Sequence, residues 1–136
     1  MMKCPVIAVG SEAKYNYIIH KSSIVNSDFT PAKLDLLEMT DNMAEDVVRA
    51  YPGLDKAALR RRVYARFSTL NQMLNTDECQ EEKKEIIRFI KKNAFNVLTN
   101  SKAPLRDKAA IILLTINYRL YRFFWLRHMN RIMNKN

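Results

Sequence analysis

"LDKAALRRRVYARFSTLNQMLNT", residues 54–76, has the pattern of a helix. Large apolar side chains recur through it at helical spacing, while four arginines lie mostly off that stripe. This pattern predicts an amphipathic helix whose apolar face packs on a core. Asp55 is the expected N-cap, because short acidic side chains accept hydrogen bonds from the first free backbone N–H groups. The apolar stripe consists of Leu59, Val63, Phe67, Leu70 and Leu74, and the arginines are Arg60, Arg61, Arg62 and Arg66.

The same periodicity on either side predicts three further helices. One begins with Thr30 as N-cap and Pro31 in the first helical position, and it ends at the "YPG" of residues 51–53. Another runs from about 77 to 100, with acids early and lysines late, which suits the helix dipole. The last begins near 104 or 105 and runs to 133. The expected inward residues are Leu34, Leu37, Asp41, Ala44, Val48 and Tyr51 in the first of these, and Ile86, Ile90, Ala94, Val97 and Leu98 in the second.

Two short strand-like runs precede the helices. They are "PVIAV", residues 5–9, and "YNYII", residues 15–19, whose alternation places Tyr15, Tyr17 and Ile19 on one face. Two short strands are marginal in water, so they need a sheet that another part of a protein supplies. The predicted fold is therefore mainly α, with about four helices after a short N-terminal β segment. The predicted division is 1–27 for the end of a sheet with its connecting loop, and 28–136 for a helical module.

The charge of the chain is concentrated near its C-terminus. The net charge is +9, and residues 101–136 carry eight basic residues against the single acid Asp107. Such a segment attracts anionic partners. The longest uncharged apolar run there, "AAIILLTINY" at 109–118, is shorter than the roughly 18 residues of a spanning helix. Cys4 and Cys79 are the only cysteines, so a disulfide framework is not predicted and a reduced, cytoplasmic setting is favoured.

The last predicted helix combines arginines with aromatic residues. Arginines around a Trp/Phe/Leu face are typical of a helix that lies in a membrane interface. Packing of the aromatic residues on the other helices is the alternative. Binding of nucleic acid is less favoured, because the basic residues accompany no recognisable reading motif. The candidate membrane-facing residues are Arg119, Arg122, Phe123, Trp125, Arg127 and Arg131.

Few residues carry a signal for catalysis or metal binding. His20 and His128 are the only histidines. The acids of residues 78–85 alternate with lysines as a solvated helix face does. No catalytic residue and no metal site is predicted within this chain.

The order of these segments resembles the C-terminal part of bacterial family 2 glycosyltransferases, GT-A enzymes that build capsules, exopolysaccharides and lipopolysaccharide. In that family a strand ends in a pattern like "YYYR-x-R-x-x-SI", and Ile18 here stands where the family has an arginine after the last tyrosine. The resemblance covers nearly the whole chain from about Val6. It rests on "KYNYIIHKSSI" at 14–24, "KLDLL" at 33–37, "YP" at 51–52, "KAALRRRVYARF" at 56–67, "KKNAFNVLTN" at 91–100 and "PLRDKAAIILLTI" at 104–116.

The resemblance implies a role in a larger enzyme. The family's nucleotide-sugar domain, its DxD motif for Mg or Mn and its catalytic base are not in these 136 residues. The expected role is therefore a structural, acceptor-side or membrane-docking part of a sugar transferase in surface polysaccharide synthesis. In the parent enzyme His20 and Ser23 would contact metal or substrate, while this chain by itself needs no cofactor.

The partners implied are the catalytic domain, an anionic membrane at the inner face of the plasma membrane, and a second copy through exposed apolar faces. The alternative is a non-enzymatic helical module that binds an anionic membrane or nucleic acid.

Overall fold

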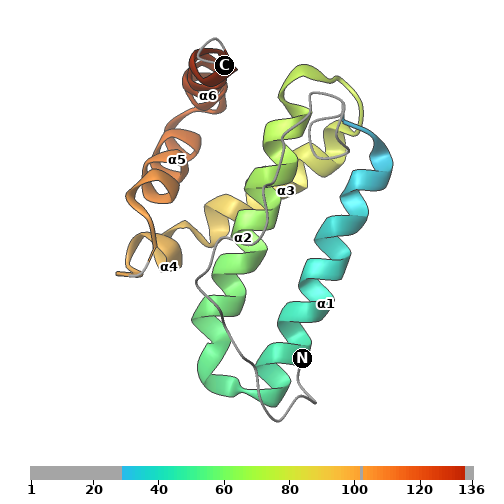
Figure 1. The fold of residues 1–136 in the computed structure, drawn as a ribbon, viewed down its shortest axis with the longest axis vertical. Helices are drawn as coiled ribbons and strands as arrows, with labels where there is room; N and C mark the ends of the chain where they lie inside the picture. Colours follow the sequence, from blue (N-terminus) through green and yellow to red (C-terminus); the bar gives the residue numbers. More distant parts are fainter. Residues whose placement is uncertain (1–28, 102, 134–136) are drawn as a thin grey trace, which may run out of the picture.

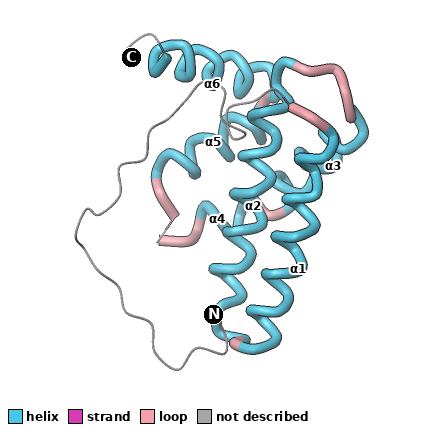
Figure 2. The backbone as a smooth tube through the Cα atoms, turned by 45° about the vertical axis from the view of Figure 1, so that its right-hand side comes forward, coloured by secondary structure: helices cyan, strands magenta, loops and turns pink. Residues whose placement is uncertain are grey.

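The computed structural model describes residues 29–101 and 103–133, which are mainly helical (Figure 1, Figure 2). The prediction of a mainly α fold is confirmed for this part, and the predicted β segment lies outside the described residues. The helices are α1 (Asp35–Ala50), α2 (Asp55–Gln72), α3 (Gln80–Lys92), α4 (Ala94–Leu98), α5 (Leu105–Ile116) and α6 (Tyr118–Met133), with short 3-10 turns at Pro31–Leu34, Pro52–Leu54 and Met73–Asn75.

Helices α1 and α2 form an antiparallel pair joined by a tight turn (Figure 1). The expected stop at "YPG" is correct, since α1 ends at Ala50 and Pro52 begins the 3-10 turn. Tyr51 is exposed rather than inward, because it follows the last helical residue with φ −141°. Asp55 is already helical, because that turn leads straight into α2 and makes Leu54 the N-cap. It still places an acid in the first turn, where the helix dipole favours one.

The helix expected over 77–100 is two helices. Cys79, at φ 52°, turns the chain before α3 begins at Gln80. The side-chain amide of Asn93 donates a hydrogen bond to the carbonyl of Phe89 at 2.9 Å, and α3 ends one residue earlier. Short polar side chains that bond to nearby backbone compete with a helix, which accounts for the break.

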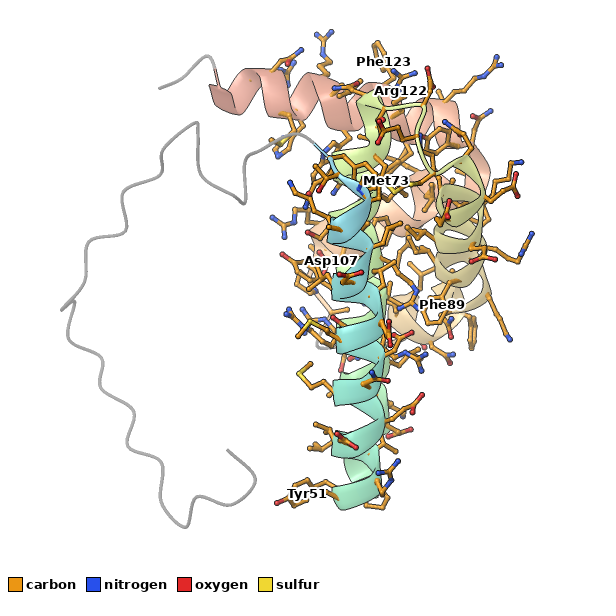
Figure 3. All side chains as sticks on the ribbon, turned by 90° about the vertical axis from the view of Figure 1, so that its right-hand side faces the viewer. Tyr51, Met73, Phe89, Asp107, Arg122 and Phe123 are labelled. Atoms are coloured by element: carbon orange, nitrogen blue, oxygen red, sulfur yellow. The ribbon has the colours of Figure 1, made fainter. Side chains whose placement is uncertain are left out.

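The helix expected over 104–133 is also two helices, divided at Asn117 (φ −159°, ψ 125°). The break turns α6 across one end of the α1–α2 pair (Figure 2, Figure 3). Asp107 on α5 forms an ion pair with Arg60 of α2 at 3.8 Å. The described part of the chain thus has six helices where about four were expected, because both long apolar patterns contain an asparagine that interrupts them.

The core forms where α2 meets α3, α5 and α6. Most of the inward residues expected in the parts that form α2, α3 and α4 are buried, and Leu59 and Leu98 are half-buried. On α1 only Ala44 and Thr40 are buried, because α1 packs mainly on α2. The core cluster consists of Val63, Phe67, Leu70, Met73, Leu74, Ile86, Ile90, Ala94, Val97, Ala103, Ile111, Leu114 and Tyr121.

A partly buried charge cluster links α1 to α2 and α3. Arg66, which the sequence pattern placed off the apolar stripe, is only 8% exposed. Its Nη1 and Nη2 donate to Oδ1 and Oδ2 of Asp41 at 2.9 and 2.7 Å, and Arg62 Nε donates to Oδ1 at 2.8 Å. The guanidinium of Arg66 lies 3.7 Å from the ring centre of Phe89. The hydrogen bond from Arg66, with support from Arg62, lowers the pKa of Asp41 to about 2. Both arginines bond to the carboxylate of Asp41, so the cluster joins three helices and keeps a net charge of one.

Candidate functional site

Asn117 sets the direction and the phase of α6. Its side-chain Oδ1 accepts a hydrogen bond from the backbone N–H of Arg119 at 2.7 Å, and its carbonyl accepts one from the N–H of Tyr121 at 3.1 Å. Asparagine is among the preferred N-cap residues, because its side chain replaces a missing helical acceptor. The cap starts a new helix at Tyr118 and thereby decides which residues of α6 face inward.

Tyr121 anchors α6 on the end of α2. The side chain is 1% exposed, and its hydroxyl donates a hydrogen bond to Oδ1 of Asn71 at 2.5 Å. Its ring lies 5.8 Å from that of Phe67 and 6.2 Å from that of Trp125, measured between ring centres. Burial holds the pKa of the Tyr121 hydroxyl well above its usual value, so it remains a donor throughout the ordinary pH range.

An exposed face of α6, beginning opposite this anchor and extending round one side of the helix, carries the candidate site. Leu120, Phe123 and Phe124 are 44, 58 and 50% exposed. Positions four apart in a helix lie one above the other. Arg119, Phe123, Arg127 and Arg131 are all exposed and therefore form one strip along the helix, beside Leu120 and Phe124. We call these six residues the outer surface of α6. The helix has four arginines and no acid, so the surface is both basic and apolar.

A shallow groove runs along part of this surface. It encloses about 410 Å³ and is lined by Phe123, Leu126, Arg127, Asn130 and Arg131. Two arginines and an aromatic residue thus line the same groove, which suits a negatively charged group that lies next to an apolar one.

Four of the six candidate membrane-facing residues belong to the outer surface: Arg119, Phe123, Arg127 and Arg131. Trp125 instead is half-buried against Tyr121, with the His128 ring 6.0 Å away. Arg122 is exposed on another side of the helix. Burial lowers the pKa of Lys83 on α3, and the charge of Arg122 adds to this effect. His20 and Ser23 lie outside the described residues.

Sequence reasoning left out Leu120 and Phe124. Their place follows from the helical phase that Asn117 sets, with Tyr121 inward. The signal that could have revealed this phase is Asn117 itself, an asparagine that interrupts an apolar run.

The rest of the described chain offers little that could perform chemistry. Within residues 29–101 and 103–133, no group of three or more His, Cys, Asp or Glu side chains is placed to hold a metal ion. The acids of "DNMAED", residues 41–46, lie in α1, where Asp41 belongs to the buried cluster. No helix in the described ranges is long and apolar enough to cross a membrane.

Comparison with known proteins found no matching family model, no matching curated protein and no matching solved structure.

Proposed function

We propose that this chain is a helical module that docks on an anionic membrane through the outer surface of α6. The observation that carries the proposal is the joint exposure of three large apolar side chains and three arginines on one face of a helix without acids. A helix of this composition lies in the interface with its apolar residues among the acyl chains and its cations at the headgroups.

The position of α6 supports this function. The helix lies across one end of the α1–α2 pair, and the labelled side chain of Phe123 points away from the bundle (Figure 3). A flat bilayer can therefore meet the outer surface along the helix without meeting the other helices first. Each basic residue near an anionic surface contributes about 1 kcal/mol, and insertion of apolar area adds to it.

Vesicle sedimentation tests the docking surface. The purified chain is expected to bind vesicles containing anionic lipid more tightly than vesicles of neutral lipid. The Phe123→Ser/Phe124→Ser variant should lose about tenfold in partition coefficient, because two exposed rings no longer insert. The Arg127→Gln/Arg131→Gln variant should lose about thirtyfold for anionic vesicles only, because two charges that each contribute about 1 kcal/mol are removed.

Matched variants separate this surface from net charge and general hydrophobicity. Lys91→Gln/Lys92→Gln removes two charges at the end of α3, and Phe95→Ser removes a ring of α4 that is 75% exposed. Both variants are expected to bind vesicles as the original chain does. Equal binding to neutral and anionic vesicles would contradict the proposal. A loss of vesicle binding in the two control variants as large as the loss in the outer-surface variants would also contradict it. Binding to duplex DNA with a steep salt dependence, without a preference for anionic lipid, would favour the nucleic-acid alternative.

We further propose that the module belongs to a glycosyltransferase that acts at the cytoplasmic side of the membrane. The support is the resemblance of the ordered segments to the C-terminal part of family 2 enzymes, together with a surface suited to the place where lipid-linked acceptors lie. In such an enzyme, Mg or Mn would stabilise the leaving diphosphate, and a carboxylate base would activate the acceptor hydroxyl. Those groups would come from the catalytic domain.

The purified 136 residues are therefore expected to transfer no sugar. The reason is that the DxD motif and the catalytic base of the family are not in these 136 residues, and no group of three or more His, Cys, Asp or Glu in the described part is placed to hold a metal ion. The measurement is product formation from a panel of nucleotide-diphosphate sugars with Mg²⁺ or Mn²⁺ and extracted lipid acceptors. Sugar transfer above that of the heat-denatured chain would contradict the assignment of catalysis to another domain.

A further inference from the structure

Helix α5 exposes an apolar stripe that no described element covers. Leu105, Ile112 and Ile116 are 84, 48 and 69% exposed. Ala109, which lies between them, is exposed as well. The four residues stand at i, i+4, i+7 and i+11, so they fall within about 60° of one another around the helix. This spacing is typical of a helix face that packs against another helix. We call these four residues the α5 stripe.

The α5 stripe lies opposite the face that α5 uses for packing in the bundle. Ile111 and Leu114 are fully buried in the core cluster. Leu114 follows Ile112 by two residues, which turns it about 200° around the helix. Helix α5 also lies at the edge of the bundle remote from α1, where a partner can reach its outer face (Figure 1). A helix with apolar residues on both faces is typical of a larger core, and the described residues cover only one face.

We propose that the α5 stripe packs against the same stripe of a second copy of this chain, in an antiparallel pair related by a twofold axis. The spacings along the stripe are four, three and four residues, so they read the same in both directions. When two copies run in opposite directions, Leu105 therefore meets Ile116 of the second copy. Ala109 meets Ile112 of the second copy, and the small alanine leaves room for the larger isoleucine. Every residue of the stripe thus finds an apolar partner, as a self-complementary twofold interface requires.

Charge favours this pairing over the self-pairing of other exposed apolar faces. The charged residues of α5 are Arg106, Asp107 and Lys108, and residues 109–116 carry no charge. Two α5 stripes can therefore meet over most of their length without repulsion. Helix α1 carries five acids against one arginine, whereas α6 carries four arginines and no acid. Because like charges that face each other are unfavourable, neither α1 nor α6 suits a second copy of itself.

The direction of the pair follows from the basic helix that comes after α5. Parallel stripes would bring the α6 helices of the two copies, with four arginines each, to the same end of the pair. Antiparallel stripes place the two α6 helices at opposite ends. Repulsion between like charges falls with distance, so it favours the antiparallel pair.

The size of the α5 stripe predicts a reversible dimer. The stripe extends over about 17 Å, from Leu105 to Ile116. Four side chains cover less than the roughly 800 Å² that each partner contributes to an interface of standard size. Small interfaces are typical of weak complexes, so we expect a dissociation constant of about 10 μM. The proposal is independent of membrane docking, which concerns α6.

Sedimentation equilibrium of the full 136-residue chain, without lipid, tests the pair. Between about 1 and 100 μM the original chain should change from monomer to dimer. Ile112→Ser/Ile116→Ser should weaken association about hundredfold and leave the chain mainly monomeric, because four isoleucines are lost from the interface of the two copies. Met39→Ser removes an apolar side chain of α1 that is 70% exposed and should leave the dimer unchanged. Circular dichroism should show one helix content throughout, since every replaced side chain is exposed.

Two complementary variants test the antiparallel register. Ala109→Glu and Ile112→Lys each place a charge in the α5 stripe, so each variant alone should remain monomeric. In a mixture of the two, the antiparallel register sets the introduced carboxylate against the introduced ammonium group, and a mixed dimer should form. A parallel pair would instead set position 109 against 109 and position 112 against 112, so the mixture would gain no ion pair.

Three results would overturn the proposal. The first is an original chain that stays monomeric up to about 100 μM. If Ile112→Ser/Ile116→Ser then also binds vesicles less tightly than the original chain, the stripe contacts lipid instead. The second is a dimer that Met39→Ser abolishes and Ile112→Ser/Ile116→Ser leaves intact, because α1 would then hold the copies together. The third is a mixture of the two charged variants that stays monomeric although the original chain dimerises, because the register would then be wrong.

Discussion

Replacement of Tyr121 with alanine is expected to cost about 4 kcal/mol of the free energy of unfolding. The ring is 1% exposed between Phe67 and Trp125, so its removal leaves a cavity where α6 meets α2. Urea unfolding measures the loss. Trp125, the single tryptophan, should also show red-shifted fluorescence in the native state, because its stacked neighbour is gone.

Two variants divide this effect into its parts. Tyr121→Phe keeps the ring and removes only the hydrogen bond to Asn71, so the expected loss is about 1 kcal/mol. Tyr64→Ala removes a tyrosine that is 46% exposed on α2 and should change stability by less than about 1 kcal/mol. Losses of equal size for Tyr121→Ala and Tyr64→Ala would mean that Tyr121 does not hold α6 in place.

Replacement of Asp41 with alanine is expected to cost about 3 kcal/mol, because it leaves the buried guanidinium of Arg66 without its carboxylate. Arg66 would retain only a longer hydrogen bond to the carbonyl of Arg62 and its contact with Phe89. Asp46→Ala is the matched variant, since it breaks an ion pair with Arg49 whose side chains are 56 and 77% exposed. Such a surface pair contributes less than about 1 kcal/mol, so urea unfolding should separate the two variants clearly.

The dependence of stability on pH gives a second measure of the Asp41 contact. The pKa of Asp41 is lowered from 3.8 to about 2 in the folded chain. A lowered folded-state pKa stabilises the fold above the unfolded-state value, and that contribution is lost as the pH falls through about 4 toward 2. The original chain should lose about 2 kcal/mol more over this range than Asp41→Ala loses. Parallel pH profiles would show that the carboxylate is not held by the two arginines.

The parts of the fold that rest on apolar periodicity were readable from the sequence. The stripe through Val63, Phe67 and Leu70 is buried as expected, because three and four residue spacings place these side chains on one face. The breaks at Asn93 and Asn117 were not predicted. Each depends on a hydrogen bond between a side-chain amide and nearby backbone, which periodicity does not register.

The composition of the candidate site could be predicted from the sequence, but which of its side chains face outward could not. The sequence shows that the last helix is basic and aromatic, yet the inward position of Trp125 follows from the phase that Asn117 sets. The buried pair of Arg66 with Asp41 was missed for a similar reason. It joins residues that are 25 positions apart, and only the packing of α1 on α2 brings them together.

The turn at Asn117 also fixes how the molecule would stand on a surface. With α6 lying flat on a bilayer, α2 extends away from the bilayer. Because α2 has 18 residues, the turn at Pro52–Leu54 would lie about 27 Å farther from the bilayer than the other end of α2. The N-terminal end of α1 lies at the same end of the bundle as α6 (Figure 1, Figure 3). In this orientation the N-terminal end of α1 would lie near lipid level, while the turn between α1 and α2 would lie in the surrounding water, free to meet partners there.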